Sequence, residues 1–230
     1  MSKSNEPKIL LYDIETTNLA ADFGTCLCIG YKWLGTNRVS VPSIMDYDGW
    51  RDDPTYDGHL LADFRDVYEQ ADMVVTYYGK GFDIKFLQAK MLEWDLGILP
   101  NTPHVDLYFT VKHNLRLSRR SLANVGYFLG LNAEKTPIEG KMWRSAQAGN
   151  HKAIKYVIDH CRADVLVLEE AYLKLRPLVR THPRVRGWDP CRVCGSNHLQ
   201  HRGPAITVTK GARHRVQCQD CGAWETRSGK

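Results

Sequence analysis

The stretch KILLYDIETTN, residues 8–18, decides the fold class of this chain. An apolar run reads as a buried strand and ends in two carboxylates, Asp13 and Glu15. Residues two apart on a strand point to the same face, so both carboxylates are expected on one face. Two like charges on a buried face repel each other unless a cation neutralises them. The stretch therefore predicts a metal site at a strand end, with an ordinary solvent-exposed strand end as the alternative.

Two further acids extend this prediction. Asp83 lies in VVTYYGKGFDIKFL, residues 74–87, where an apolar run turns into a helix, and Asp164 lies in the helical segment YVIDHCRADVLVLEEAY, residues 156–172. Oxygen ligands suit Mg²⁺ or Mn²⁺, and paired ions of this kind drive phosphoryl displacement in nucleases and polymerases. We expect Asp13, Glu15, Asp83 and Asp164 to hold two such ions. For Asp83, helix capping is the alternative.

His160 lies four residues before Asp164, so the two side chains share one helix face. An imidazole with an unperturbed pKa of about 6.5 suits a general base for an attacking water near neutral pH. A helix-surface histidine is the alternative. A fifth acid, Asp106 in HVDLYF, either contributes to the site as an outer group or caps a turn or helix.

The order of DIETT, GKGFD and HCRADV along the chain resembles the motif order of the DEDD superfamily of 3′→5′ exonucleases. The resemblance covers roughly residues 8–175. It is closest to the stand-alone RNase H-like predicted exonucleases related to the proofreading domain of family B DNA polymerases, and residues 104–131 support that branch. The resemblance implies an α/β fold, with an RNase H-like mixed sheet flanked by helices.

The resemblance also implies an activity. It implies that this protein, like those enzymes, removes nucleoside 5′-monophosphates from the 3′ end of single-stranded DNA by a two-metal mechanism. In that mechanism His160 orients or deprotonates the attacking water. The spacing from His160 to Asp164 is that of the branch that carries Tyr, and Tyr78 or Gly79 stands where relatives usually carry Asn. The candidate substrate contacts are Thr16, Thr17, Asn18, Phe82, Arg119 and Arg120.

Three other functions stay open at this point. An exoribonuclease or a structure-specific endonuclease would use the same fold, since fold alone does not fix function. A nucleic-acid-binding protein that kept the fold without catalysis belongs to a different class. The presence of all four acids argues against that last reading.

Two cysteine pairs near the C-terminus form a second motif. Cys191 and Cys194 in CRVCG, with Cys218 and Cys221 in CQDCG, are typical of a four-cysteine zinc site in a zinc ribbon. A module of roughly 40 residues buries too little core alone, so the zinc is expected to be structural. The stretch between the pairs predicts a hairpin with Gly211 at its turn. A redox dithiol is the alternative.

Charge divides the chain unevenly. The net charge is +5, but the part from Arg176 onward holds eleven Lys or Arg and three Asp or Glu, whereas the rest holds twenty and twenty-three. A basic tail favours a polyanionic partner such as nucleic acid, with a solubilising surface as the alternative. For the zinc module itself, protein docking is the alternative to nucleic-acid binding. We expect a nuclease domain at residues 1–175, a basic linker at 176–190 and a zinc ribbon at 191–230.

The periodicity predicts strands at residues 8–15, 26–34, 38–44, 73–77 and 105–107, and helices at 60–70, 83–94, 121–129 and 150–174. Ser118 is the expected cap of the third helix, and residues 130–140 the expected loop. No apolar run approaches the roughly 20 residues that span a bilayer, and no signal segment opens the chain. We expect a cytoplasmic protein of a bacterium or phage-infected cell, with no membrane partner and with Cys26, Cys28 and Cys161 packed in its core.

Overall fold

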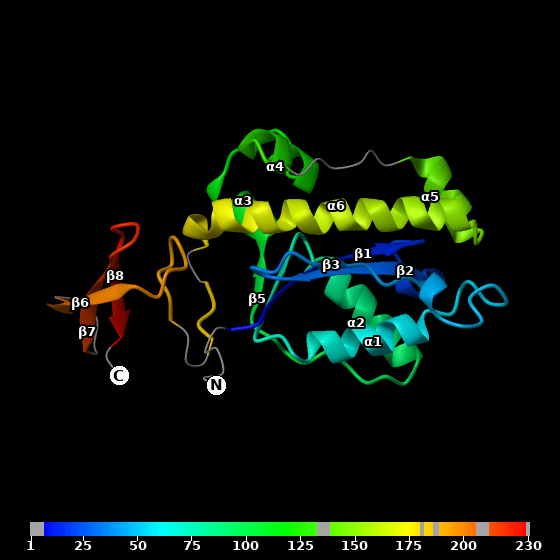
Figure 1. Cartoon of the computed structure of the whole chain (residues 1–230), viewed down its shortest axis with the longest axis horizontal. Coiled ribbons are helices and arrows are strands. Elements are labelled where there is room, and N and C mark those ends of the chain that lie inside the picture. The colour runs from blue at the N-terminus through cyan, green and yellow to red at the C-terminus, as the bar shows by residue number, and fades with distance from the viewer. Residues whose placement is uncertain (1–6, 133–138, 180–181, 186–188, 206–211, 229–230) are drawn as a thin grey trace.

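A five-stranded mixed sheet forms the centre of the molecule in the computed structural model, which describes residues 7–132, 139–179, 182–185, 189–205 and 212–228. The strand order is β3-β2-β1-β4-β5 (Figure 1). Its strands are β1 (Ile9–Thr16), β2 (Cys26–Trp33), β3 (Val39–Ser40), β4 (Met73–Thr76) and β5 (His104–Asp106). β1 pairs antiparallel with β2 and parallel with β4, and β4 pairs parallel with β5. The predicted α/β class with a mixed sheet is confirmed.

Helices cover both faces of this sheet (Figure 1). One face carries α1 (Gly58–Tyr68) and α2 (Asp83–Glu93). The other carries the long α6 (His151–Leu175), with α3 (Leu107–Asn114), α4 (Leu122–Leu129) and α5 (Gly140–Gln147) packed on it. Short 3₁₀ turns are η1 (Ala21–Phe23), η2 (Ile44–Asp46) and η3 (Arg176–Leu178).

The alternation of β1 decides which face the acids occupy. Ile9 and Leu11 pack in the core that α3, α4 and the second half of α6 share. Leu10, Tyr12 and Ile14 pack in the core that includes α1 and α2. Because side chains alternate along a strand, Asp13 and Glu15 continue the row of Ile9 and Leu11 and face α6.

Helix α6 is fixed closely above β1 and β2. Asn150 caps its first turn, since its side chain accepts the Ala153 N–H at 3.1 Å. Gly30 pairs with Asp13 in the sheet. A Cβ atom at Gly30 would lie 2.7 Å from Cys161 Sγ, so the absence of a side chain there permits the close approach of α6. Cys26, Cys28 and Cys161 are all buried, as predicted.

Two predicted element boundaries are wrong. β3 covers only Val39–Ser40, although the chain stays beside β2 a little further: the Ile29 N–H donates to the Pro42 carbonyl at 3.0 Å, and Ser43 forms an isolated bridge with Cys28. The chain then forms η2, with Ser43 and Asp46 as a capping box. The cap of α4 is Ser121 rather than Ser118. Its Oγ accepts the Asn124 N–H at 3.3 Å, so the helix begins one residue later than predicted.

Two helices were not predicted at all. α3 follows β5 without a loop, because Asp106 ends the strand and caps the helix in one step. α5 begins where the predicted loop ends, at Gly140. Each has eight residues, a length at which helical periodicity is weak and tertiary packing decides the outcome.

A second, antiparallel sheet of three strands forms the C-terminal module, with β6 (Leu199–Pro204), β7 (Arg213–Cys218) and β8 (Trp224–Ser228) in that order. β6 pairs antiparallel with β7. The hairpin predicted over residues 206–217 supplies most of β7 as its second arm, whereas its first arm and its turn at Gly211 lie outside the described residues. β8 was not predicted.

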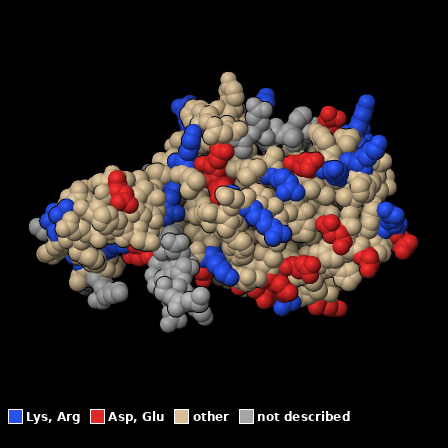
Figure 2. Space-filling view, viewed as in Figure 1, with Lys and Arg blue, Asp and Glu red and all other residues tan. Residues whose placement is uncertain are grey.

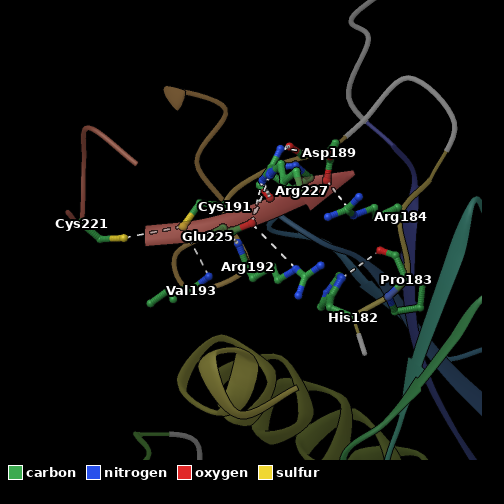
Figure 3. Close-up of polar contacts among 11 residues, drawn as sticks. His182, Pro183, Arg184, Asp189, Cys191, Arg192, Val193, Cys221, Glu225 and Arg227 are labelled. Atoms are coloured by element: carbon green, nitrogen blue, oxygen red, sulfur yellow. Dashed lines mark hydrogen bonds and ion pairs between the residues drawn. The ribbon is translucent and has the colours of Figure 1, made fainter. Parts of the chain in front are cut away.

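Ion pairs and hydrogen bonds of charged side chains connect β8 to the segment that leads into this module (Figure 3). Arg227 is almost fully buried and contacts Asp189 and Glu225, each at 3.0 Å. Glu225 also accepts the Arg192 N–H at 2.6 Å, and Asp189 pairs with Arg184 at 3.0 Å. These contacts join the segment before the first cysteine pair to the last strand.

The segment after α6 packs back on the helix. The Tyr172 hydroxyl contacts His182 Nε2 at 2.7 Å, and burial lowers the pKa of His182 to about 4. Arg176 is 4% exposed, and its guanidinium lies against Gly195, the glycine that follows the first cysteine pair. The expected boundaries at residues 175 and 190 stay a prediction.

Charge on the visible surface is uneven (Figure 2). Lys and Arg gather over α5 and the start of α6, where Lys141, Arg144, Lys152 and Lys155 are exposed. Asp and Glu gather at the lower edge, over α1 and α2. No helix in the described part of the chain is both long enough and apolar enough to cross a membrane.

Candidate active site

The end of β1 gathers the first set of possible metal ligands. Ligand atoms of Asp13, Glu15 and Cys161 all lie within 4.8 Å of one another. Glu15 pairs with Cys28 across the sheet, and the register shifts between Glu15 and Thr16. Such a bulge bends a strand locally and re-aims its side chains, here beside the acidic pair.

Helix α6 brings a second set against the first. Glu15, His160 and Asp164 also have ligand atoms within 4.8 Å of one another. His160 Nε2 lies 3.9 Å from Glu15 Oε1 and 3.8 Å from Asp164 Oδ2. Glu15 belongs to both sets, so the sheet and the helix meet at one acidic centre, as the strand and helix periodicities predict. The carboxylates of Asp13, Glu15 and Asp164 are the hard oxygen donors that Mg²⁺ and Mn²⁺ prefer.

The imidazole of His160 is held in place from the side. Trp143 on α5 meets it edge-on, with ring centroids 5.3 Å apart at 90°. His160 is only 1% exposed, so the alternative of a surface histidine is wrong. Its Nε2 points at the carboxylates, where a proton could be exchanged.

Asp83 stands at the first position of α2 and is 4% exposed. Burial raises the pKa of its carboxyl to about 7, although main-chain hydrogen bonds from Asp83 itself and from Ile14 oppose the increase. Ile14 lies between Asp13 and Glu15, so Asp83 reaches the same strand end. Asp83 belongs to neither set of close ligand atoms among the described residues, and its role as a ligand stays a prediction.

Asp106 acts on the main chain. Its carboxylate accepts the N–H groups of Tyr78 at 2.8 Å, Lys80 at 3.0 Å and Tyr108 at 3.0 Å. It therefore caps α3 and orders the loop that leads to Asp83. Burial raises the pKa of Asp106, while these three hydrogen bonds lower it. Of the two alternatives left by the sequence, capping is the one present in the structure.

An open cleft of about 440 Å³ leads to the acids. Its walls are formed by Asp13, Tyr77, Tyr78, Tyr108, Arg120, Ser121, Leu122 and Asp164. Tyr78 has φ +69°, a left-handed conformation that is strained for a bulky residue. A Cβ atom at Gly81 would lie 2.4 Å from the Tyr78 ring, so this glycine makes room for the ring.

The six predicted substrate contacts have different places in the structure. Arg120 lines it. Thr16 donates to the Asn18 carbonyl at 2.8 Å, and Thr17 accepts the Thr25 N–H at 2.9 Å, so all three residues shape the loop after β1. Phe82 packs on Phe86 with centroids 5.7 Å apart, and Arg119 is exposed. Their roles toward a substrate stay predictions.

Sequence reasoning missed two participants in this arrangement. Cys161 was expected only to pack, but its sulfur also lies among the ligand atoms of Asp13 and Glu15. Trp143 comes from a helix that was not predicted. The position of Cys161 directly after His160 was the one signal in the sequence, and for Trp143 the sequence carried none.

The four cysteines of the C-terminal module form one cluster, with all sulfurs within 4.8 Å of one another. Cys191 and Cys221 are 3.6 Å apart, and Cys194 and Cys218 are 3.5 Å apart. Tetrahedral zinc with Zn–S bonds of about 2.3 Å needs sulfurs roughly 3.8 Å apart, so the cluster fits the ion. Gly195 and Gly222, which follow the pairs, have φ +80° and +74° and form the tight turns that aim the thiols inward. The cluster fits a zinc ribbon.

A family model of the RNase H superfamily matches residues 10–176. The chain belongs to this superfamily. The match begins at β1 and ends just after α6, so it contains every residue of the acidic centre. No curated protein matches the sequence at a significant level.

Solved structures show the same fold in nucleases. The chain is similar to Brucella melitensis NrnC, with a TM-score of 0.52 and 16% identity over 76% of each chain. It is similar to an exonuclease I whose structure was described as suggesting how processivity is achieved, with a TM-score of 0.51, 12% identity, and coverage of 77% of this chain and 41% of that one. It is also similar to E. coli exonuclease I in complex with a dT13 oligonucleotide, with a TM-score of 0.51, 10% identity, and coverage of 74% of this chain and 41% of that one. At these identities the likeness establishes the RNase H-like fold alone.

Proposed function

We propose that this protein is a metal-dependent 3′→5′ exonuclease that hydrolyses single-stranded DNA to nucleoside 5′-monophosphates. One observation carries the proposal. Asp13 and Glu15 from β1 meet His160 and Asp164 from α6 at a single acidic centre, in a chain of the RNase H superfamily. Membership of the superfamily supports hydrolysis of nucleic acid, and the nuclease neighbours share the fold.

Asp13, Glu15, Asp83 and Asp164 would hold two Mg²⁺ or Mn²⁺ ions. Such ions stabilise the charge that develops on a phosphodiester and lower the pKa of bound water. The side chain of His160 would take the proton of the attacking water, because its Nε2 faces Glu15 and Asp164. Trp143 would keep the imidazole in that orientation. Arg120, in the wall of the cleft, would contact a phosphate.

The C-terminal module would hold the nucleic acid. In this proposal residues 191–230 form a zinc-bound unit, joined through the basic linker at 176–190 to the nuclease domain at 1–175. Charge supports this role, because residues 191–230 hold seven Lys or Arg against two Asp or Glu, and the linker adds four Arg against one Asp. Cationic side chains supply much of the affinity for a phosphate backbone.

The test compares 5′-labelled linear single-stranded DNA, matched RNA and circular single-stranded DNA in Mn²⁺. The proposal predicts a ladder that shortens from the 3′ end of the linear DNA, and an intact circle. Faster shortening of the RNA would show that RNA, rather than DNA, is the preferred substrate. Cutting of the circle would make the protein an endonuclease, and intact strands that shift in a native gel would make it a binding protein without activity.

A further inference from the structure

A row of aromatic rings leads away from the acidic cleft. Tyr78 and Tyr108 meet edge-on with centroids 4.7 Å apart, and Phe109 lies 6.3 Å from Tyr78 and 5.4 Å from Tyr108. His113 continues the row 6.3 Å beyond Phe109. We call Tyr108, Tyr78, Phe109 and His113 the aromatic row. The first two rings line the cleft that contains Asp13 and Asp164.

The far end of the row lines a second cavity, of about 460 Å³. Phe109 and His113 form part of its wall, together with Lys80, Asn114 and the chain after α6 at Leu178 and Val179. Phe109 directly follows Tyr108 in α3, so consecutive residues of one helix contribute to the walls of the two hollows. Lys80 and His113 are exposed, and Phe109 is partly exposed.

The row is built into the fold. The loop before α2 carries Tyr78, and α3 carries the other three rings. Asp106, 5% exposed, joins this loop to α3, because its carboxylate accepts the N–H groups of Tyr78, Lys80 and Tyr108. Tyr78 is kept in a left-handed conformation and is still 45% exposed. A strained, exposed aromatic residue at the rim of an acidic cleft is the kind of outlier that points to ligand contact.

The direction of the row matters as well. β5 and α3 lie at the end of the nuclease body that is nearest to the three-stranded C-terminal sheet (Figure 1). The second cavity also borders Leu178 and Val179, which begin the segment that runs to that sheet. A strand that followed the row would therefore leave the cleft toward the basic C-terminal module.

We propose that the aromatic row and the second cavity bind unpaired nucleobases of the substrate strand, upstream of the nucleotide held at the acidic centre. Every base has a flat face, so stacking on such rings is tolerant of sequence and selects for unpaired strands. Lys80 contacts a backbone phosphate beside the rings. This inference rests on the proposed function, because the row is assigned to the strand that the acidic centre cleaves.

The test measures binding of fluorescently labelled oligo-dT, a trinucleotide and a decanucleotide, to the full chain in buffer without Mg²⁺ or Mn²⁺. The variant Phe109→Leu keeps apolar volume but removes the ring, Phe109→Tyr keeps the ring, and Phe128→Leu removes an exposed ring from α4, outside both hollows. Phe109→Leu is expected to weaken decanucleotide binding about 5- to 150-fold, the range for loss of one base–aromatic stack, and to weaken trinucleotide binding less. Phe109→Tyr and Phe128→Leu are expected to bind the decanucleotide as the unmodified protein does.

A salt titration provides a second readout. Lys80→Ala is expected to reduce the slope of log Kd against log salt concentration by about 0.7, the value for one phosphate contact on a single strand. Decanucleotide binding that is unchanged in Phe109→Leu, or absent from the unmodified protein, would overturn the proposal and assign the second cavity to another occupant.

Hydrolysis, measured separately, keeps the two proposals apart. If binding depends on the Phe109 ring but no hydrolysis is detected, base binding by the aromatic row is supported and the proposed nuclease activity is rejected. Hydrolysis with ring-independent binding would reject the row alone.

Discussion

The imidazole Nε2 of His160 lies 3.8 Å from Asp164 Oδ2, four residues further along α6. The same nitrogen lies 3.9 Å from Glu15 on β1. One buried side chain thus bridges the sheet and the helix at the point where the acids converge. The position of α6 relative to β1 therefore sets the distances among His160, Glu15 and Asp164 as well as the packing of the helix on the sheet.

Replacing His160 tests its role in proton transfer. We expect His160→Gln to lower kcat by about 10²- to 10⁴-fold, the usual contribution of a positioned general base, because glutamine cannot take up a proton. Trp143→Leu, which removes only the neighbouring ring, should lower kcat less. A His160→Gln enzyme with unchanged kcat would show that another group is the base.

Gly30 controls how closely α6 approaches β1. A Cβ atom there would lie 2.7 Å from Cys161 Sγ and 2.9 Å from Val165 Cγ2. Gly30→Ala should therefore destabilise the protein by about 1–3 kcal/mol and lower activity, since α6 must shift with Asp164. Gly126→Ala is the matched control. Its Cβ atom would meet Val167 at an ordinary 3.4 Å, inside a helix that alanine favours. Equal melting temperatures for both variants would contradict the argument.

Asp83 should make stability depend on pH when no divalent metal is present. Burial raises the pKa of its carboxyl to about 7, so between pH 4 and 7 the native state holds a proton that the unfolded state has released. The free energy of unfolding therefore decreases as pH rises through this range. Asp83→Asn, which cannot ionise, should show a smaller decrease in melting temperature between pH 5 and 8. Identical pH profiles for the two proteins would show that this carboxyl does not hold its proton in the native state.

Mn²⁺ should reverse the same effect. If Asp83 binds the ion, the metal favours the ionised carboxylate, and the protein gains more stability from Mn²⁺ at pH 8 than at pH 5. The measurement is a set of thermal melts with and without Mn²⁺. In Asp83→Asn the gain should be smaller at both pH values. An equal gain in both proteins would place the ion away from Asp83.

Zinc should be required for the C-terminal module. We expect about one equivalent of zinc per chain, lost in Cys218→Ser, with faster proteolysis within residues 189–228. Cleavage of long single strands should slow, while cleavage of a trinucleotide should change little. Cys26→Ser, which replaces a buried cysteine outside the cluster, should keep its zinc. Full zinc content in Cys218→Ser would exclude the four-cysteine site.

The main parts of the acidic centre were predictable because they rest on local periodicity. The two-residue spacing of Asp13 and Glu15 gives one strand face, and the four-residue spacing of His160 and Asp164 gives one helix face. The sheet and the long helix then bring the two faces together. For Asp83, the link to β1 through Ile14 agrees with the prediction without testing metal binding.

The remaining parts depend on contacts that the sequence does not encode locally. The bridge from Asp106 to Tyr78 spans 28 residues, and the ring contact from Trp143 to His160 requires a helix that forms only by packing on α6. α3 was missed because its first turn is fixed by the carboxylate that ends β5. Such features follow from tertiary structure, so propensity gives no signal for them.

The most direct test of the acidic centre as a metal-dependent active site is the rate of hydrolysis of 5′-labelled single-stranded DNA in saturating Mn²⁺, measured for the unmodified protein and for Asp164→Asn. We expect hydrolysis that requires the metal and that falls by orders of magnitude in the variant, because the substitution removes a proposed ligand at the acidic centre. Thermal melts of the two proteins would establish that both are folded. Hydrolysis by Asp164→Asn at the rate of the unmodified protein, or hydrolysis that persists with chelator, would contradict metal-dependent catalysis at the acidic centre.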